Sequence, residues 1–354
     1  MEHTRRSLLA SAGALAAGTV AGCLGDAGAT NATDATDGPA AQASFFVFGD
    51  VASAVAGDAT ATDLLVPVGQ HGHGWEPGPR VRESIRDADL LVHGMEGFQP
   101  WVDDVLGDLA ADDADVAAVD ASVDVDLLAA GEGEDGDHDD EHEGDHDGEH
   151  HEEEPHTEEH TESGDHDEES GDGHDHGSTD PHFWMDPTRV RTATATVRDA
   201  LSEVDPDAAD AHAANAESFR ASLTALDERL AALVGDAPRD TVFVAGHDSF
   251  GYLAERYGLH VEALTGVGPD DQPTTRDVER AREVVETHDL RFVCADPIES
   301  QRAADQIVAE TAAEEVLPLT AIPGLTAEWA AEDWGYLDVM ENVNLPTLER
   351  VLGE

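Results

Sequence analysis

The sequence contains no lysine, so all 18 of its basic residues are arginines, set against 79 aspartates and glutamates. The formal net charge is −61 at pH 7. Nucleic acid and anionic lipid surfaces are poor candidate partners, because phosphate binding requires a positive surface. Residues 131–178 hold 23 of the acids, and removing these from the −61 still leaves −38. The whole surface is therefore acidic, which indicates a high-salt habitat where screening makes so much like charge tolerable.

Cysteine is also scarce, with only two residues in the chain. Cys23 closes the run Val20-Ala-Gly-Cys23, which resembles the lipobox of exported lipoproteins, and Arg5-Arg6 resembles the start of a twin-arginine export signal. The apolar stretch between them is too short to span a membrane. We therefore expect residues 1–23 to be a twin-arginine lipoprotein signal, and a lipid on Cys23 to anchor the protein on the outer, extracytoplasmic face of the cell membrane. With Cys23 lipidated, no intramolecular disulfide can form.

Residues 24–43 are rich in Ala, Thr, Asp and Gly, and we expect them to be a flexible tether. Beyond them, short apolar runs alternate with helical stretches. The expected strands are residues 45–48, 63–68, 89–93, 115–121, 241–245, 259–264, 290–295 and 316–319. The expected helices beside them are residues 50–56, 79–88, 100–110, 249–256, 275–287, 300–313 and 334–352. Apolar strands that alternate with helices indicate parallel sheets covered on both faces.

Two helices separate the halves of this pattern. The first follows Asp186-Pro187, and the second runs from Pro206 to Gly235, long enough to span about 40 Å at 1.5 Å per residue. We predict an α/β fold with two lobes, each built on a central parallel sheet, joined by a long rigid helix. The predicted boundaries are an N-terminal lobe over 44–185, linking helices over 186–236 and a C-terminal lobe over 237–354. A ligand site is expected in the cleft between the lobes, at the carboxyl ends of the strands.

Residues 131–178 interrupt the first lobe with a tract that has almost no apolar residue, so we expect this loop to be disordered. It contains ten histidines among its acids. Acids are uninformative in so acidic a chain, but histidine binds metal, so the tract is interpreted as a weak metal collector, with a solvated spacer as the alternative. Its auxiliary donors include His138, His142, His146, His150, His151, His174 and His176.

Three other histidines stand where the strand pattern expects a site. His73 follows the run that ends at Val68, His182 follows the tract, and His247 directly follows the strand 241–245. Three imidazoles with an open fourth position form a recurrent zinc site. Two Asp-Pro steps flank His182 and predict an exposed, stiff turn before a helix that begins at Asp186-Pro187.

These motifs resemble the metal-binding solute-binding proteins of ABC transporters, of the ZnuA/TroA type, from about Ser44 to Leu352. The first ligand motif of that family, Pro-x-Gly-x-Asp-Pro-His-x-Tyr-Glu-Pro, is similar to residues 67–77, which places its ligand on His73. His71-Gly72 replaces its Asp-Pro, so His71 is a competing donor. The second and third motifs resemble Asp180-Pro-His182 and the segment from Gly246-His247 to Gly258.

The resemblance also bears on which metal is bound. Manganese-type members have a carboxylate at the third position, whereas His247 resembles the zinc type, and nitrogen donors suit zinc. The fourth position of the family, an aspartate, aligns with Leu317, which cannot supply a carboxylate. The fourth ligand is then water, Glu76 or an acid of the tract, and the sequence does not choose among them.

The function that this resemblance implies is a lipid-anchored, monomeric, extracytoplasmic receptor that binds Zn²⁺ and delivers it to the membrane permease of an ABC importer. One alternative is a zinc-dependent hydrolase that uses the same three histidines. The sequence contains no His-Glu-x-x-His motif, and nothing else marks a general base. A second alternative is a metal-sequestering or adhesin-like surface protein without a transporter.

Overall fold

The structure is a computed structural model that describes residues 39–72, 74–130, 179–268 and 272–353. The signal, the lipid site at Cys23, most of the tether, His73 and the tract 131–178 lie outside the described residues. No helix in these described ranges is long and apolar enough to cross a membrane.

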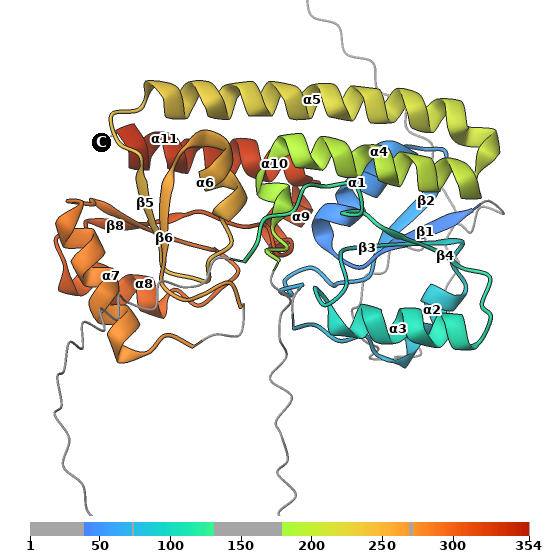
Figure 1. Ribbon diagram of the computed structural model, residues 1–354, viewed down its shortest axis with the longest axis horizontal. Helices are drawn as coiled ribbons and strands as arrows, with labels where there is room; N and C mark the ends of the chain where they lie inside the picture. Colours follow the sequence, from blue (N-terminus) through green and yellow to red (C-terminus); the bar gives the residue numbers. More distant parts are fainter. Residues whose placement is uncertain (1–38, 73, 131–178, 269–271, 354) are drawn as a thin grey trace, which may run out of the picture. The chain divides into compact units, whose positions relative to one another are not determined.

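Each of the two lobes contains a four-stranded sheet in which every pairing is parallel (Figure 1). The N-terminal sheet has the order β2-β1-β3-β4 and consists of β1 (Ala40–Ala43), β2 (Ala61–Leu64), β3 (Leu90–His93) and β4 (Ala117–Asp120). The C-terminal sheet has the order β6-β5-β7-β8 and consists of β5 (Thr241–Val244), β6 (His260–Ala263), β7 (Phe292–Ala295) and β8 (Glu315–Pro318). The predicted α/β fold with two parallel sheets is confirmed.

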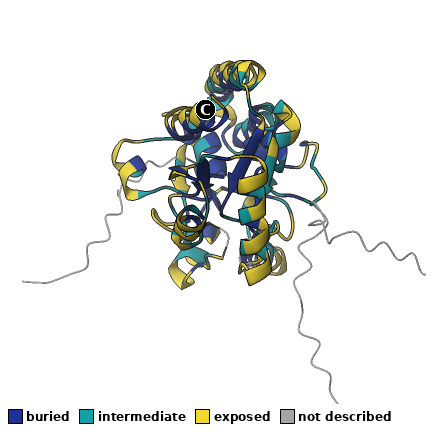
Figure 2. Cartoon of the chain, turned by 90° about the vertical axis from the view of Figure 1, so that its left-hand side faces the viewer, coloured by how far each residue is buried: buried dark blue, intermediate teal, exposed yellow. Residues whose placement is uncertain are grey.

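Helices cover both faces of each sheet. The outer faces carry α2 (Pro79–Arg86) and α3 (Pro100–Ala111) in the first lobe, and α7 (Thr275–Thr287) and α8 (Arg302–Glu310) in the second. The helices on the inner side, which the two lobes share, are α1 (Phe46–Ala56), α4 (Pro187–Val204), α5 (Ala209–Asp236), α6 (Gly251–Tyr257), α9 (Ala327–Ala331), α10 (Tyr336–Val339) and α11 (Leu345–Gly353). The central strands β3, β5 and β7 are buried along their whole length, and Figure 2 shows the inward sides of the helices as buried and their outward turns as exposed.

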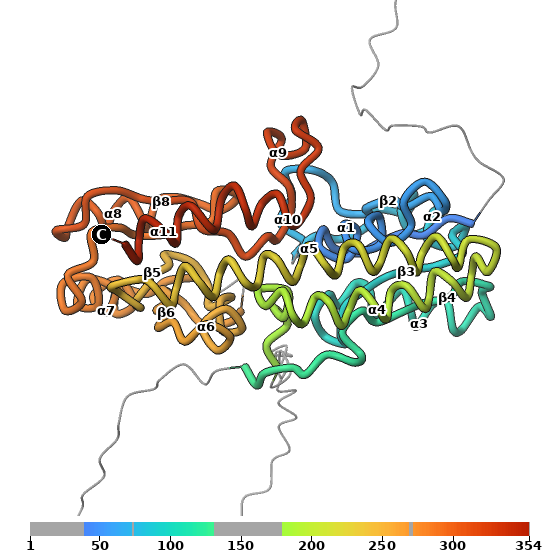
Figure 3. Tube along the Cα trace, turned by 90° about the horizontal axis from the view of Figure 1, so that it is seen from above, coloured from blue at the N-terminus to red at the C-terminus, as the bar shows by residue number. Residues whose placement is uncertain are grey.

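Three apolar cores result from these layers. One lies on the outer face of each sheet, and a third extends beneath α1, α4, α5, α10 and α11 through both lobes. The 28-residue helix α5 packs against α1 and α4 in the first lobe and against α6, α10 and α11 in the second, as Figure 3 shows from above. A short π-helix (Met340–Asn344) joins α10 to α11.

Two predictions about the start of the first lobe are wrong. Residues 45–48 were expected to form a strand, but Phe46–Phe48 form the first turn of α1, because a short apolar run is compatible with either a buried strand or a buried helix. The first strand is Ala40–Ala43, which lies within the segment that we assigned to the tether. Its Ala-Ala-Gln-Ala sequence has no β-branched or aromatic residue, so only the pairing with β2 and β3 selects it.

The chain is held together where it enters and leaves the tract. Ala129 and Thr179 form an antiparallel bridge, and the Asp180 N–H donates to the Leu128 carbonyl at 2.9 Å. The hydroxyl of Tyr252, on α6, accepts from the Leu128 N–H at 2.9 Å and donates to the Asp180 carbonyl at 2.6 Å. The second lobe therefore fastens both ends of the interruption to each other.

Candidate metal centre

His182 lies in a fixed and fully buried position, with 0% of its surface exposed. The Asp180 carboxylate accepts from the His182 backbone N–H at 2.9 Å and lies 2.8 Å from Nδ1 of the imidazole. The expectation of an exposed turn is wrong here, because the residues after His182 pack into a cluster of five aromatic rings: Phe45, Phe48, Phe98, Phe183 and Trp184. The expected helix start is confirmed, with Asp186 as the N-cap of α4 and Pro187 in its first turn.

His247 follows β5 and is also buried, at 6% exposure. Its Nε2 lies 3.4 Å from Nε2 of His182, and the two ring centroids are 5.3 Å apart. Zinc–nitrogen bonds of about 2.0–2.1 Å in a tetrahedral site place neighbouring ligand atoms about 3.3–3.4 Å apart. The two imidazoles therefore face each other across the distance of one edge of a zinc coordination tetrahedron. Burial lowers the pKa of His182 against the opposing effect of Asp180, and this favours the neutral form that binds metal.

Glu299 is a carboxylate at this site that sequence reasoning missed. Its Oε1 lies 3.3 Å from Nδ1 of His247 and 3.4 Å from Nε2 of His71. It lies in the segment after β7, the strand next to β5 at the point where the strand order of the C-terminal sheet reverses. The sequence signal was therefore its place after an apolar strand, the same signal that identified His247. Burial alone would raise the pKa of Glu299, but hydrogen bonds and charges from His247 and His71 lower it to about 2.

The segment that carries the first ligand motif is attached to the second lobe through its backbone. The Gly69 and Gly72 N–H groups donate to the Leu325 and Pro323 carbonyls at 2.7 and 2.9 Å, and the Gln99 side chain donates to the Gly72 carbonyl at 3.1 Å. A Cβ atom at Gly72 would lie 2.5 Å from the Phe45 ring, so the approach requires glycine. This backbone places the half-buried His71 beside Glu299, with its ring 6.1 Å from that of His247.

The predicted set of three histidines is represented in the described residues by His182 and His247, because His73 lies outside them. Within those residues, no three His, Cys, Asp or Glu side chains form a complete metal site. Glu76, one predicted fourth ligand, is exposed, and Leu317 is a buried apolar residue of β8. In the described residues, the side chains of Glu76 and Leu317 therefore place no oxygen beside the two imidazoles.

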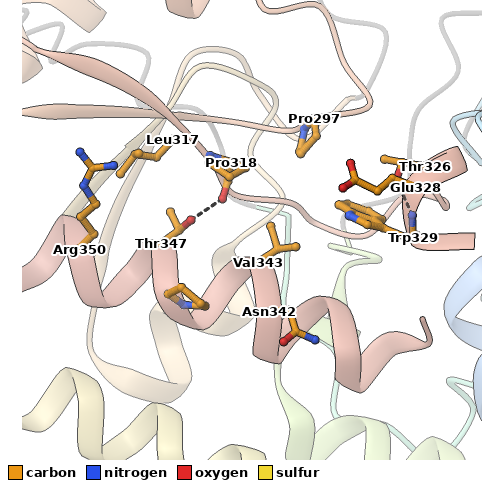
Figure 4. Close-up of a pocket in the computed structure, with 11 residues that line it drawn as sticks. Pro297, Leu317, Pro318, Thr326, Glu328, Trp329, Asn342, Val343, Thr347 and Arg350 are labelled. Carbon is orange, nitrogen blue, oxygen red and sulfur yellow. Dashed lines mark hydrogen bonds between the residues drawn. The ribbon is translucent and has the colours of Figure 1, made fainter. Parts of the chain in front are cut away.

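A separate cavity lies on the second lobe between β8, α9 and the π-helix (Figure 4). Its volume is about 590 Å³, and its wall is formed by Pro297, Leu317, Pro318, Thr326, Glu328, Trp329, Asn342, Val343, Pro346, Thr347 and Arg350. The described residues of its wall include no histidine and one cation, Arg350, which is paired with Glu315. The cavity does not share the chemistry of the imidazole pair.

Comparison with known proteins shows which family combines these features. The family described as "ZnuA: Zinc-uptake complex component A periplasmic" matches residues 42–351, which is most of the chain. The chain belongs to the ZnuA family. The resemblance that the histidine motifs indicated is therefore confirmed at the level of the family.

Two bacterial relatives show how much of the chain is shared. The chain is 30% identical over 307 residues to the zinc-binding lipoprotein AdcA of Streptococcus pneumoniae, covering 87% of this chain and 54% of AdcA. It is 27% identical over 306 residues to the high-affinity zinc uptake system protein ZnuA of Bacillus subtilis, covering 86% and 85%. The chain thus spans about half the length of the AdcA relatives and most of the length of the Bacillus protein.

Solved structures show the same ZnuA-type fold. The Zn(II)-bound ZnuA-like domain of Streptococcus pneumoniae AdcA has a TM-score of 0.67 at 24% identity, over 90% of this chain and 100% of that domain. The laminin-binding protein Lmb of Streptococcus agalactiae has a TM-score of 0.69 at 20% identity, over 89% and 100%. At these identities the likeness establishes the architecture of the two lobes.

Proposed function

We propose that this protein is an extracytoplasmic zinc receptor that binds Zn²⁺ between its lobes and delivers it to an ABC-type metal importer. The observation that carries this proposal is the pair of buried imidazoles, whose Nε2 atoms are 3.4 Å apart while each Nδ1 faces a carboxylate. A carboxylate on the far nitrogen is the usual outer partner of a metal-binding histidine. Membership of the ZnuA family and the zinc-related names of the relatives support the same proposal.

The proposed ligands are His182 and His247 through Nε2 and His73 from the first motif, with His71 as a competing donor and water, Glu76 or an acid of the tract as the fourth ligand. Nitrogen donors at the third position favour zinc over manganese. We also propose that the lipid at Cys23 holds the receptor at the membrane, that the permease is its membrane partner, and that it acts as a monomer without bond chemistry. Against the hydrolase alternative, two carboxylates beside the imidazoles in the described residues, Asp180 and Glu299, already face imidazole nitrogens, so neither is placed as a general base.

The test is metal analysis followed by competitive titration in molar salt, on the full chain and on a variant that lacks residues 131–178. We expect one tight zinc site in both proteins, with manganese bound far more weakly. His182→Ala and His247→Ala should each weaken that site by more than about 100-fold, the upper end of what the loss of an outer partner costs.

The matched control is His288→Ala, because His288 is exposed and its hydrogen bonds with other described residues involve only its backbone. His212, on α5, is unsuitable, since it is fully buried and lies 2.9 Å from the Thr60 hydroxyl. Zinc binding that survives His247→Ala unchanged, or equal affinities for manganese and zinc, would contradict the proposal.

A further inference from the structure

Both buried imidazoles are held in the same way, although their partners come from unrelated segments. His182 directs Nε2 toward the pair and Nδ1 toward Asp180, two residues before it. His247 directs Nε2 toward the pair and Nδ1 toward Glu299, a residue 52 positions later that reaches it only through the fold. The second arrangement has no counterpart in the sequence motif around His247.

The segment that carries Glu299 is braced on several sides. The Glu299 N–H donates to the Asp296 carbonyl at 3.1 Å, and the Gln301 side chain donates to the Glu299 carbonyl at 3.1 Å. Asp296 in turn accepts from the Ile298 N–H at 2.9 Å and from the Thr320 hydroxyl at 2.5 Å. The other carboxylate oxygen of Glu299 would lie 3.2 Å from a Cβ atom at position 246, where the chain has glycine. These hydrogen bonds hold the backbone that carries Glu299, and the glycine at position 246 leaves room for its carboxylate.

We propose that Glu299 is the positioning residue of His247 and, through the same oxygen, the link between His247 and the first ligand segment at His71. This inference rests on the proposed zinc-binding function. The carboxylate accepts the Nδ1–H of His247, which fixes the tautomer, leaves the Nε2 lone pair facing the ion and increases its basicity. Because His71 belongs to the first lobe and His247 to the second, one carboxylate aligns donors from both lobes before the ion arrives.

The geometry distinguishes this role from direct coordination. Nδ1 and Nε2 point outward from opposite sides of the imidazole ring, and Glu299 lies on the Nδ1 side, whereas His182 lies on the Nε2 side. An ion shared by His182 and His247 through Nε2 is therefore bound on the other side of the ring from Glu299. The carboxylate acts on the metal through the imidazole.

The test compares Glu299→Gln and Glu299→Ala in the full chain, with Glu286→Gln and Glu286→Ala as matched controls. Glu286 is an exposed glutamate of α7 in the same lobe. Affinity is measured by chelator competition in molar salt with less than one equivalent of zinc, so that the tightest site reports. The visible absorption of one equivalent of Co²⁺ reports the number and type of donors. Thermal unfolding without metal shows that each variant folds.

We expect Glu299→Ala to weaken zinc binding by about 100-fold and Glu299→Gln by about tenfold, because glutamine keeps one neutral acceptor for Nδ1–H. The Co²⁺ spectrum should stay that of the parent in both variants. Zinc affinities of the Glu299 variants within about threefold of those of the Glu286 controls would overturn the proposal, since the loss of an outer partner should weaken metal binding by more than this. A changed Co²⁺ spectrum would also overturn it, by showing that Glu299 is itself a ligand. If the parent chain binds no zinc tightly, the proposed function itself is wrong. This outcome differs from one in which the parent binds zinc tightly and the Glu299 variants bind it equally well.

Discussion

Tyr252 is the residue through which the second lobe holds the approach to His182, and Tyr252→Phe tests that arrangement. The ring is fully buried. Its hydroxyl donates to the Asp180 carbonyl at 2.6 Å and accepts from the Leu128 N–H at 2.9 Å. Phenylalanine keeps the ring, including its contact with the Arg189 guanidinium 4.6 Å from the ring centroid, and removes only the hydroxyl.

The expected magnitude follows from the two groups that lose their partner. A buried polar group left without a hydrogen bond costs about 1–3 kcal/mol. Asp180 is 4% exposed, so leaving its carbonyl without a partner should cost a free energy near the middle of that range. Leu128 is half-buried, so water can replace part of the hydrogen bond that its N–H loses. We expect the free energy of unfolding to fall by about 2–4 kcal/mol. Zinc affinity should fall by about tenfold, because Asp180 orients the imidazole of His182.

The assay is urea unfolding in molar salt, with and without zinc, beside zinc competition. Tyr257→Phe is the matched control, because the Tyr257 hydroxyl donates to Asp227 at 3.0 Å on a half-buried face of the same helix. That variant should lose about 1 kcal/mol and leave zinc affinity unchanged. Equal destabilisation in the two variants, or a Tyr252→Phe protein that binds zinc like its parent, would refute the reasoning.

Three further predictions concern pH, the tract and the anchor. Asp50 accepts a hydrogen bond from the Tyr336 N–H at 2.9 Å, and burial raises the pKa of its carboxyl group to about 6. The contribution of Asp50 to the free energy of unfolding is therefore present below its unfolded pKa and is lost as the pH rises through about 6. Asp50→Asn should therefore be more stable than the parent by roughly 1–2 kcal/mol at pH 8 and equal to it near pH 4, in urea titrations at both pH values. Deletion of residues 131–178 should leave one tight zinc site and remove additional weak sites, which in the parent weaken below about pH 6.5 as free imidazole gains a proton. Isothermal titration measures both proteins, and identical stoichiometry would make the tract a spacer. Cys23→Ser should move the protein from the membrane fraction to the soluble fraction without changing zinc affinity, and persistent membrane association in high salt would contradict lipidation.

Local sequence chemistry was sufficient for much of the fold. The bounds predicted for α7, Thr275–Thr287, agree with the structure, because Thr274 and Asp277 form a capping box that marks where the helix begins. The apolar strands β3, β5 and β7 were also placed to within two residues. In contrast, β1 is selected by two neighbouring strands rather than by its own composition.

The site was predictable only where its residues belong to local motifs. His182 and His247 could be found from their neighbours in the sequence, but the burial of His182 depends on aromatic rings that come from three separate segments. Glu299 reaches His247 because β5 and β7 are adjacent in the sheet, and this order is a property of the whole lobe. In a chain with 79 acids, a place after an apolar strand does not by itself distinguish Glu299, because Asp296 follows the same strand.

The bridge between Ala129 and Thr179 bears on what happens if the chain is cut. A protease acting between these residues would divide the protein into two fragments, and Ala129 of one is already paired with Thr179 of the other. Both imidazoles of the facing pair belong to the later fragment, and the aromatic cluster that buries His182 contains rings from both. The nicked protein should therefore persist as a non-covalent pair of fragments, and the two pieces, produced separately, should reassemble by complementation. In an environment with proteases, one cut in the tract would not by itself separate the two imidazoles from the rings around them.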